Sequence, residues 1–237
     1  MIYNCIAGSI MSDNIDFYPI IAGLDKIEPI TLAKDSNKPF QFNPNEFSIR
    51  ACPGIKDITQ LGYIIPLWQD LLIKYDHENG VQVMQSGNMY DFDGKNFFDV
   101  QFHRESSLGE YSFGPEYVNF SLKLRCPWYV KTKPSTSILL LPVQYNQELP
   151  FTVASGILQS DKYPMLVAQI ILKKFQGEII LKKGTPLIQV VAIKDQPKLV
   201  IHKDDTGIKK NINVIKNWLY SRMHSAIQYK NLEKILK

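Results

Sequence analysis

The sequence predicts a mainly β protein, an antiparallel barrel or sandwich, with a C-terminal amphipathic helical tail. Three observations indicate this. Many short stretches alternate polar and apolar residues or are short apolar runs, turn-forming residues separate them, and the apolar spacing changes near residue 203. We therefore expect two parts, a β-rich domain over 1–203 and a basic helical tail over 204–237.

The clearest strand is the stretch NFSLKLRC at 119–126. Phe120, Leu122, Leu124 and Cys126 alternate with polar residues, which is typical of a half-buried strand. Further strands are expected, in chain order, at 46–52, 62–75, 81–86, 96–103, 137–142, 165–172, 177–181, 187–193 and 198–202. Turn formers lie between them, among them Gly80, 91–94, Gly109, 114–115, Pro134 and Gly184, and no helical pattern is expected between the strands.

The tail has a different period. Its apolar residues recur at spacings of three, four and five, and they are Ile208, Ile212, Ile215, Leu219, Met223, Ile227 and Leu232. From residue 203 onward, seven Lys and one Arg against two Asp and one Glu give a charge of +5, so the preceding residues sum to about −1. The tail is a candidate for docking on its own domain, on a partner subunit, or on an anionic surface of membrane or nucleic acid.

Composition excludes some classes of protein. The chain has 237 residues, 45% of them hydrophobic and 21% charged, which is ordinary for a globular protein, and no apolar run approaches the roughly 20 residues that cross a bilayer. The first residues lack a basic leader and a cleavage site, so we expect a cytoplasmic location and no transmembrane segment. Cys5, Cys52 and Cys126 lack paired spacing and are expected to be buried free thiols.

Three segments together carry a resemblance. They are RACPGIKDITQLGYIIPLWQDLLI at 50–73, LRCPWYVKTKPSTSILLLPVQ at 124–144 and GTPLIQVVAIK at 184–194. This pattern resembles an uncharacterised family of phage-encoded proteins and spans about 50–195. The resemblance implies a viral origin, with the host cytoplasm or the virion as the location, and it implies no activity.

A second resemblance covers only 156–191, which is similar to the β-clip core of dUTPases and dCTP deaminases. Gly156, Ile157, Asp161 and Tyr163 fit that family's pyrimidine-binding hairpin, and Gly184, Ile188 and Gln189 fit its later phosphate-side strand. The resemblance implies a β-clip-like domain. It also implies a nucleotide site in which Gln159, Tyr163, Gly184 and Gln189 bind the ligand.

Two departures from that family argue against its activity. Gln159 lies where the family has the aspartate that takes a proton from water, and an amide cannot accept that proton at neutral pH. The upstream Arg-Ser-Ser phosphate segment is replaced by QYNQELPF. Asp161 is then the remaining candidate base. The same stretch also has a purely structural interpretation, in which a hairpin turn, a sheet-packed Tyr163 and a tight KKGT turn join strands.

Other chemistry has little support in the sequence. His77, His103, His202 and His224 show no metal-ligand spacing, and neither a phosphate-binding loop nor a serine-hydrolase elbow occurs, so no metal and no cofactor is expected. Asp57 and Asp70 flank the apolar run LGYIIPLW. Each is a candidate ligand or base, and turn capping is the favoured interpretation.

The segment CPWYVKT at 126–132 has two interpretations. Trp128 and Tyr129 with Lys131 and Lys133 resemble a stacking platform for single-stranded nucleic acid, but the near-neutral domain disfavours that partner. Alternatively, Trp128 and Tyr129 form the core and rim of a barrel end.

Two main functional hypotheses follow, besides the less favoured binder of single-stranded nucleic acid. The first is a non-enzymatic, phage-encoded binding protein, either a virion or assembly component or a factor acting on a host protein. Exposed aromatics are its interface candidates, namely Trp128, Trp218 and Tyr220, and a homo-oligomer is expected. The second is a nucleotide-binding enzyme of the dUTPase type with an altered active site at Asp161.

Overall fold

The computed structural model describes residues 15–21, 29–36, 53–76, 80–86, 90–91, 93–94, 97, 100–104, 113–145 and 149–194. The fold over these residues is mainly β, and every strand pair is antiparallel, as the sequence predicts. The tail at 204–237 that the sequence predicts to be helical, with Trp218 and Tyr220, lies outside the described residues. So do the strands expected at 46–52 and 198–202.

The first sheet has five strands in the order β1-β7-β11-β9, with β6 pairing to β7 as well. Its strands are β1 (Asp16–Pro19), β6 (Val100–His103), β7 (Ser121–Lys131), β9 (Phe151–Val153) and β11 (Met165–Leu172). The long central strand β7 follows the predicted alternation. Leu122, Leu124, Cys126 and Val130 are fully buried on one face.

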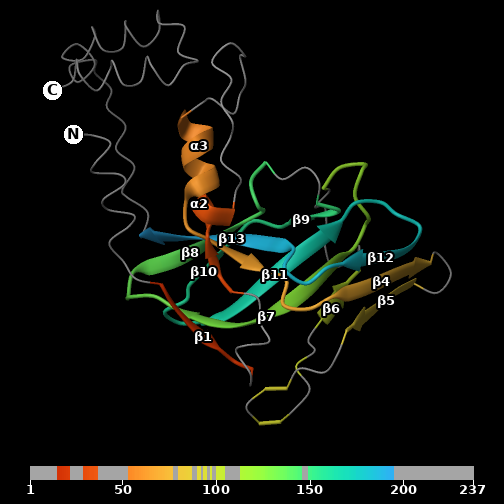
Figure 1. Cartoon of the computed structure of the whole chain (residues 1–237), viewed down its shortest axis with the longest axis horizontal. Helices are drawn as coiled ribbons and strands as arrows, with labels where there is room; N and C mark the ends of the chain where they lie inside the picture. The colour runs from red at the N-terminus through yellow and green to blue at the C-terminus, as the bar shows by residue number, and fades with distance from the viewer. Residues whose placement is uncertain are drawn as a thin grey trace, which may run out of the picture.

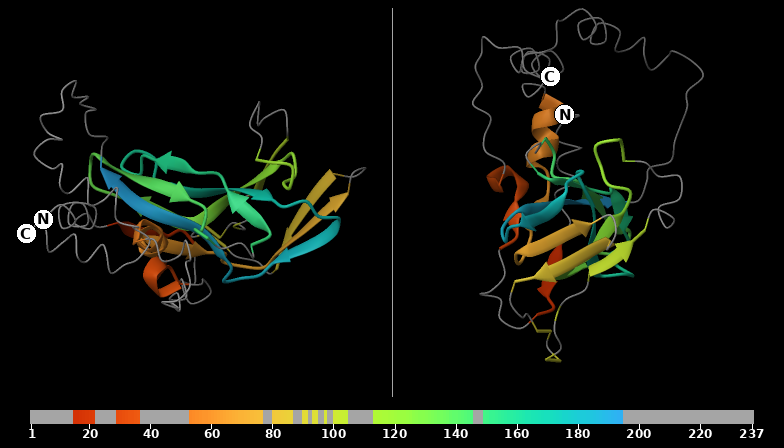
Figure 2. Two further views of the ribbon diagram at one scale, coloured as in Figure 1. Left: turned by 90° about the horizontal axis from the view of Figure 1, so that it is seen from above. Right: turned by 90° about the vertical axis from the view of Figure 1, so that its right-hand side faces the viewer.

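The second sheet also has five strands, in the order β10-β8-β13-β3-β2. They are β2 (Thr31–Leu32), β3 (Tyr63–Pro66), β8 (Thr136–Leu141), β10 (Gly156–Leu158) and β13 (Pro186–Lys194). Ile65, Ile138 and Val190 on this sheet share one buried cluster with the apolar face of β7. The two sheets therefore form a sandwich, and Figure 2 shows them as two layers.

A third sheet extends from one end of the sandwich (Figure 1). It has the order β12-β4-β5, with β4 (Leu71–Asp76), β5 (Gly80–Gln85) and β12 (Gly177–Leu181). The run predicted as one strand at 62–75 is thus two strands, β3 and β4, in different sheets. The chain turns between them at 67–70, where Leu67 donates its N–H to the Thr185 carbonyl and accepts from Gly184 N–H.

Two short helices interrupt the strands, and the expectation that no helix would occur there is wrong. They are α2 (Ala33–Ser36) and α3 (Pro53–Gln60), which projects from the sandwich in Figure 1. Pro53 occupies the first helical position, where its missing N–H costs no hydrogen bond. No helix in the described part of the chain is long and apolar enough to cross a membrane.

Candidate functional site

Two turns meet at the end of the sandwich farthest from the third sheet. The Thr132 hydroxyl donates to the Thr136 carbonyl at 2.6 Å, so its oxygen accepts from the Ser160 hydroxyl at 2.7 Å. All three side chains are buried. This contact joins the turn at 132–135, between β7 and β8, to the turn at 159–164. The fold thereby brings together two segments that the sequence singles out, CPWYVKT and the dUTPase-like stretch.

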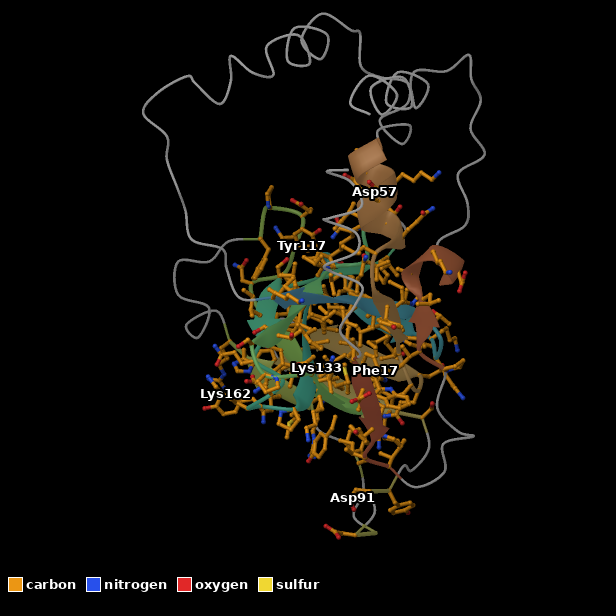
Figure 3. All side chains as sticks on the ribbon, turned by 90° about the vertical axis from the view of Figure 1, so that its left-hand side faces the viewer. Phe17, Asp57, Asp91, Tyr117, Lys133 and Lys162 are labelled. Carbon is orange, nitrogen blue, oxygen red and sulfur yellow. The ribbon has the colours of Figure 1, made fainter. Side chains whose placement is uncertain are left out.

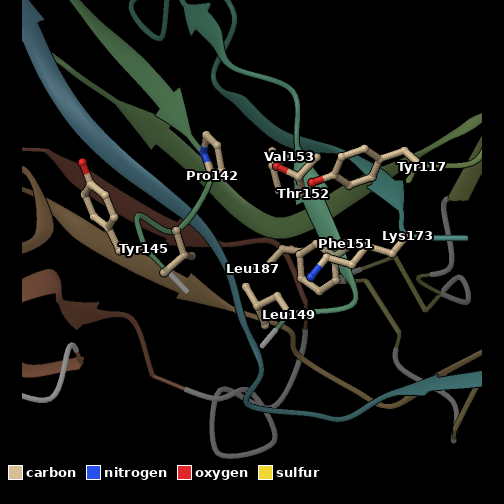
Figure 4. Close-up of a pocket in the computed structure, with 10 residues that line it drawn as sticks. Tyr117, Pro142, Tyr145, Leu149, Phe151, Thr152, Val153, Lys173 and Leu187 are labelled. Carbon is tan, nitrogen blue, oxygen red and sulfur yellow. The ribbon is translucent and has the colours of Figure 1, made fainter. Parts of the chain in front are cut away.

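The turn at 159–164 carries three of the residues expected to act on a nucleotide. The Gln159 carbonyl accepts from the N–H groups of Lys162 and Tyr163. The side chains of Gln159 and Asp161 are exposed, and Tyr163 is 69% exposed. Figure 3 looks onto this end of the sandwich, where Lys162 and Lys133 are labelled. None of these side chains lines the cavity beside Phe151 and Leu187 (Figure 4) or the one beside Tyr75 and Phe175.

The flanking strands do not form the hairpin that the sequence predicts. β10 pairs with β8 in the second sheet, whereas β11 pairs with β7 and β9 in the first. The turn at 159–164 therefore crosses from one sheet to the other. The KKGT segment is a tight turn between strands, as expected, because Thr185 N–H donates to the Lys182 carbonyl at 3.0 Å. It joins β12 of the third sheet to β13 of the second.

Gln189, which the sequence suggests as a ligand-binding residue, is buried and holds a helix in place. Its side chain is 0% exposed, and its Nε2 donates to the carbonyls of Ile58 at 2.8 Å and Leu61 at 2.6 Å. These carbonyls lie in and just after the last turn of α3, where helical partners are lacking. Gln189 thus fastens α3 to the second sheet, and its amide does not reach solvent.

Gly184 lies at the opposite end of β13 from the Thr132–Ser160 contact. Gly184 adopts φ 82, a conformation that suits glycine, and its N–H donates to the Leu67 carbonyl. The strand β13 runs away from Gly184 and ends at Lys194, which pairs with Thr136. The Thr136 carbonyl accepts from the Thr132 hydroxyl. Within one chain, the fold does not bring Gly184 and Gln189 to Gln159, Asp161 and Tyr163.

Trp128 and its neighbour Tyr129 lie on opposite faces of β7. Trp128 is only 7% exposed and packs edge-on against Phe17 with ring centroids 6.4 Å apart. The interpretation of Trp128 as an exposed interface anchor is therefore wrong, because the alternation of β7 turns it into the core. The core-and-rim interpretation fits these positions, with Tyr129 on the outer face.

Tyr129 is the middle member of an exposed row that crosses three strands. Tyr18 on β1 and Met165 on β11 pair directly with it. The exposed fractions are 50% for Tyr18, 36% for Tyr129 and 38% for Met165. We name these three side chains the outer row. Asp16 on β1 and Lys131 on β7 are also paired and exposed, two positions along the strands from Tyr18 and Tyr129. A negative and a positive side chain therefore flank the outer row.

The aspartates that flank the LGYIIPLW run, Asp57 and Asp70, lie in different parts of the fold. Asp57 is exposed on α3. Asp70 caps the turn at 182–185, because its Oδ1 accepts from Lys183 N–H at 2.7 Å and its Oδ2 pairs with Lys182 Nζ at 3.0 Å. The backbone N–H of Lys183 and, next, the Lys182 side chain lower the pKa of the Asp70 carboxyl. Asp70 thus has the turn-capping role that the sequence favours.

This cap predicts a pH dependence. The pKa of Asp70 is lower in the folded chain than the value of about 3.9 typical of unfolded chains, so the ionised cap stabilises the fold above that value. The stabilisation is lost as the pH falls through the folded pKa. We expect wild type to be more stable than Asp70→Asn at pH 6, and the difference to shrink below about pH 4. Urea unfolding across this range measures it, and a difference independent of pH would contradict the cap.

Two further expectations concern thiols and metals. Cys126 is a buried free thiol, as expected, and burial raises its pKa to about 12, so it stays protonated and unreactive. Cys5 and Cys52 lie outside the described residues. Among the described residues, no group of three or more His, Cys, Asp or Glu side chains is placed to hold a metal ion.

No protein-family model matches this chain, and no curated protein matches it.

Proposed function

We propose that this chain is a phage-encoded, non-catalytic assembly protein whose copies associate through the outer face of the first sheet. The observation that carries the proposal is the outer row, in which Tyr18, Tyr129 and Met165 lie side by side across three strands and all remain exposed. Aromatic side chains and Met are enriched at protein interfaces. The virion or the host cytoplasm is the location that this proposal implies.

A second copy fits the outer row because the surface is self-complementary. Consider a two-fold axis parallel to the strands and lying between β1 and β7. Such an axis places Tyr18 of one copy opposite Tyr129 of the second copy, and Asp16 of the first opposite Lys131 of the second. By symmetry, Tyr129 and Lys131 of the first copy face Tyr18 and Asp16 of the second. Each opposite-charge pair favours this register, while the aromatic side chains lose their contact with water.

The arrangement of the dUTPase-like residues supports binding over catalysis. Gln159 cannot act as a base, and the Gln189 amide donates to Ile58 and Leu61 instead of facing a ligand. Asp161 lies on an exposed turn, where its side chain faces solvent. These positions favour the binding hypothesis over the altered enzyme.

The direct test is the sedimentation behaviour of the full chain. We expect a concentration-dependent species of twice the chain's mass in the wild type, and a monomer in Tyr129→Lys, because a charge at the centre of the row must be desolvated on association. The matched control is Ile180→Lys, since Ile180 is an exposed apolar side chain on the third sheet. The proposal fails if wild type stays monomeric at high concentration, or if both variants reduce association equally.

A second measurement separates the two forms of the first hypothesis. Mass spectrometry of purified virions is expected to detect this chain at a fixed copy number per particle. Detection in infected cells but never in particles would instead favour an accessory factor acting on a host protein.

A further inference from the structure

The strand β12 forms one edge of the third sheet. Among the described strands it pairs with β4 on one side and with none on the other. Figure 1 shows this sheet extending from one end of the sandwich. An edge strand presents backbone N–H and C=O groups that have no partner in the sheet, so a further strand can add there. The edge of β12 is therefore a candidate binding surface.

The register of the third sheet shows which backbone groups of β12 point outward. Ser86 N–H donates to the Asp70 carbonyl at 3.0 Å, so every second residue of β4 counted from Asp70 bonds toward β5. The alternate residues of β4 bond toward β12, which places Ile179 in a hydrogen-bonded pair. The N–H and C=O groups of Glu178 and Ile180 therefore point away from the sheet.

β12 lacks the features that protect most edge strands from pairing. It has five residues, none of them Pro or Lys, and its register with β4 has no bulge. Its one charged residue is Glu178, whose carboxylate pairs across the sheet with Lys74 on β4. Because this charge is neutralised within the sheet, it does not repel an added strand.

A row of apolar side chains crosses the exposed face of the sheet and ends at β12. Ile180 pairs with Leu72, and Leu72 pairs with Met84, so the row runs across β12, β4 and β5. Ile180 is 52% exposed and Met84 is 44% exposed. A strand added beside β12 continues this row, because its residue opposite Ile180 lies on the same face.

The charges on either side of the row cancel in pairs. On one side Lys74 pairs with Glu178, and on the other Lys182 Nζ pairs with Asp70 at 3.0 Å. Both pairs lie within the sheet, so these four charges do not select an ionic partner. An uncharged segment with an apolar residue opposite Ile180 is the complementary one.

The other edge of the sheet, β5, suits an added strand less well. Its outward-bonding residues include Val81 and Val83, whose side chains are partly buried against the main core cluster. A strand added there has to place its own paired side chains on the side that faces the sandwich. On β12 the equivalent side chains, those of Glu178 and Ile180, are exposed.

We propose that the edge of β12 binds an extended, uncharged segment of a partner protein as a fourth strand of the third sheet. The backbone of that segment exchanges hydrogen bonds with Glu178 and Ile180, and a β-branched apolar side chain opposite Ile180 extends the row. This edge is separate from the outer row, so the inference does not depend on self-association.

Titration of the full chain with the capped peptide Thr-Thr-Val-Thr-Thr, followed by NMR, tests the proposal. This sequence reads the same in both directions, so it presents Val opposite Ile180 in either orientation. We expect saturable binding, with hydrogen exchange of the Glu178 and Ile180 amides slowed at least about tenfold at saturation. The Ile179 amide is the internal control, because it already bonds to β4 and its exchange should not change.

Two methylated peptides separate backbone pairing from apolar contact. N-methylation of the Val removes the N–H that donates to the Ile180 carbonyl, and it is expected to weaken binding at least about tenfold. N-methylation of the Thr that follows the Val removes an N–H that points to solvent. The affinity of this second peptide should stay within about threefold of the unmethylated one.

The variant Ile180→Pro removes the outward N–H on β12, and Val83→Pro makes the same change on β5 as the matched control. We expect only Ile180→Pro to weaken peptide binding at least about tenfold, with circular dichroism checking that both variants fold. If either variant fails to fold, the methylated peptides decide.

Four results would overturn the proposal. They are no binding of the peptide, equal binding of the two methylated peptides, equal weakening by the two folded proline variants, and protection of the Glu178 and Ile180 amides by rising protein concentration alone. The last result would mean that a second copy of this chain occupies the edge.

Discussion

Replacing Trp128 with alanine is expected to lower the free energy of unfolding by about 3–5 kcal/mol, the range found for large aromatic side chains removed from protein cores. Trp128 is only 7% exposed, belongs to the main core cluster, and packs against Phe17 of the neighbouring strand. Its loss leaves a cavity in the core, next to Phe17, that nearby side chains can fill only in part. Urea unfolding followed by circular dichroism measures the change.

The matched control is Tyr129→Ala, one residue further along the same strand. Tyr129 is on the outer face, so this substitution should cost no more than about 1 kcal/mol, measured at concentrations where the chain is monomeric. The pair distinguishes a core residue from a surface residue within one strand. Equal effects of the two substitutions would contradict the placement of Trp128 in the core.

Replacing Gln189 with leucine is expected to lower the free energy of unfolding by about 2–3 kcal/mol. The leucine has a similar volume, but it donates no hydrogen bond, so the carbonyls of Ile58 and Leu61 lose their buried partner. Because those carbonyls close the end of α3, the loss should be concentrated there. Hydrogen exchange of the amides in Pro53–Gln60 is expected to become faster before exchange in β13 does.

Gln169→Leu is the control for this substitution. Gln169 lies on β11, and its Nε2 donates to the Ser121 hydroxyl at 2.5 Å, a single partner that can rotate. We expect a cost of about 1 kcal/mol and no change in exchange at α3. If Gln189→Leu costs no more than Gln169→Leu, the attachment of α3 through Gln189 is wrong.

The strands could be predicted from the sequence because a strand that is buried on one face alternates apolar and polar residues. The alternation at 119–126 places Leu122 and Leu124 in the core, and its continuation along β7 sends Trp128 inward and Tyr129 outward. The turn-capping role of Asp70 followed from its position at a strand end. Such features depend on residues close together in the chain.

The assignment of strands to sheets could not be predicted in the same way. Successive strands with a short connection usually pair, yet β10 and β11 lie in different sheets, as do β7 and β8. The hydrogen bond between the Thr132 and Ser160 hydroxyls joins the two turns that cross between the sheets. It forms only because these turns, which are distant in the sequence, lie next to each other in the fold. For α3, Pro53 at a helix start was a local signal, but eight residues are too few for a clear helical period.

The candidate site was only partly visible in the sequence. Tyr129 belonged to a segment singled out for its aromatics, but Tyr18 and Met165 come from strands distant in the chain. Their pairing with Tyr129 depends on sheet order, which leaves no local pattern. The role of Gln189 was equally hidden, because a motif match cannot show whether an amide faces a ligand or a helix end.

The self-complementary contact between Asp16 and Lys131 is tested most directly by charge reversal and mixing. In sedimentation equilibrium, Asp16→Lys alone and Lys131→Asp alone are each expected to be monomeric, since like charges then face each other across the two-fold axis. An equal mixture of the two variants is expected to form dimers that contain one copy of each, because every contact again joins opposite charges. A mixture that stays monomeric, or single variants that associate as wild type does, would contradict assembly through this face.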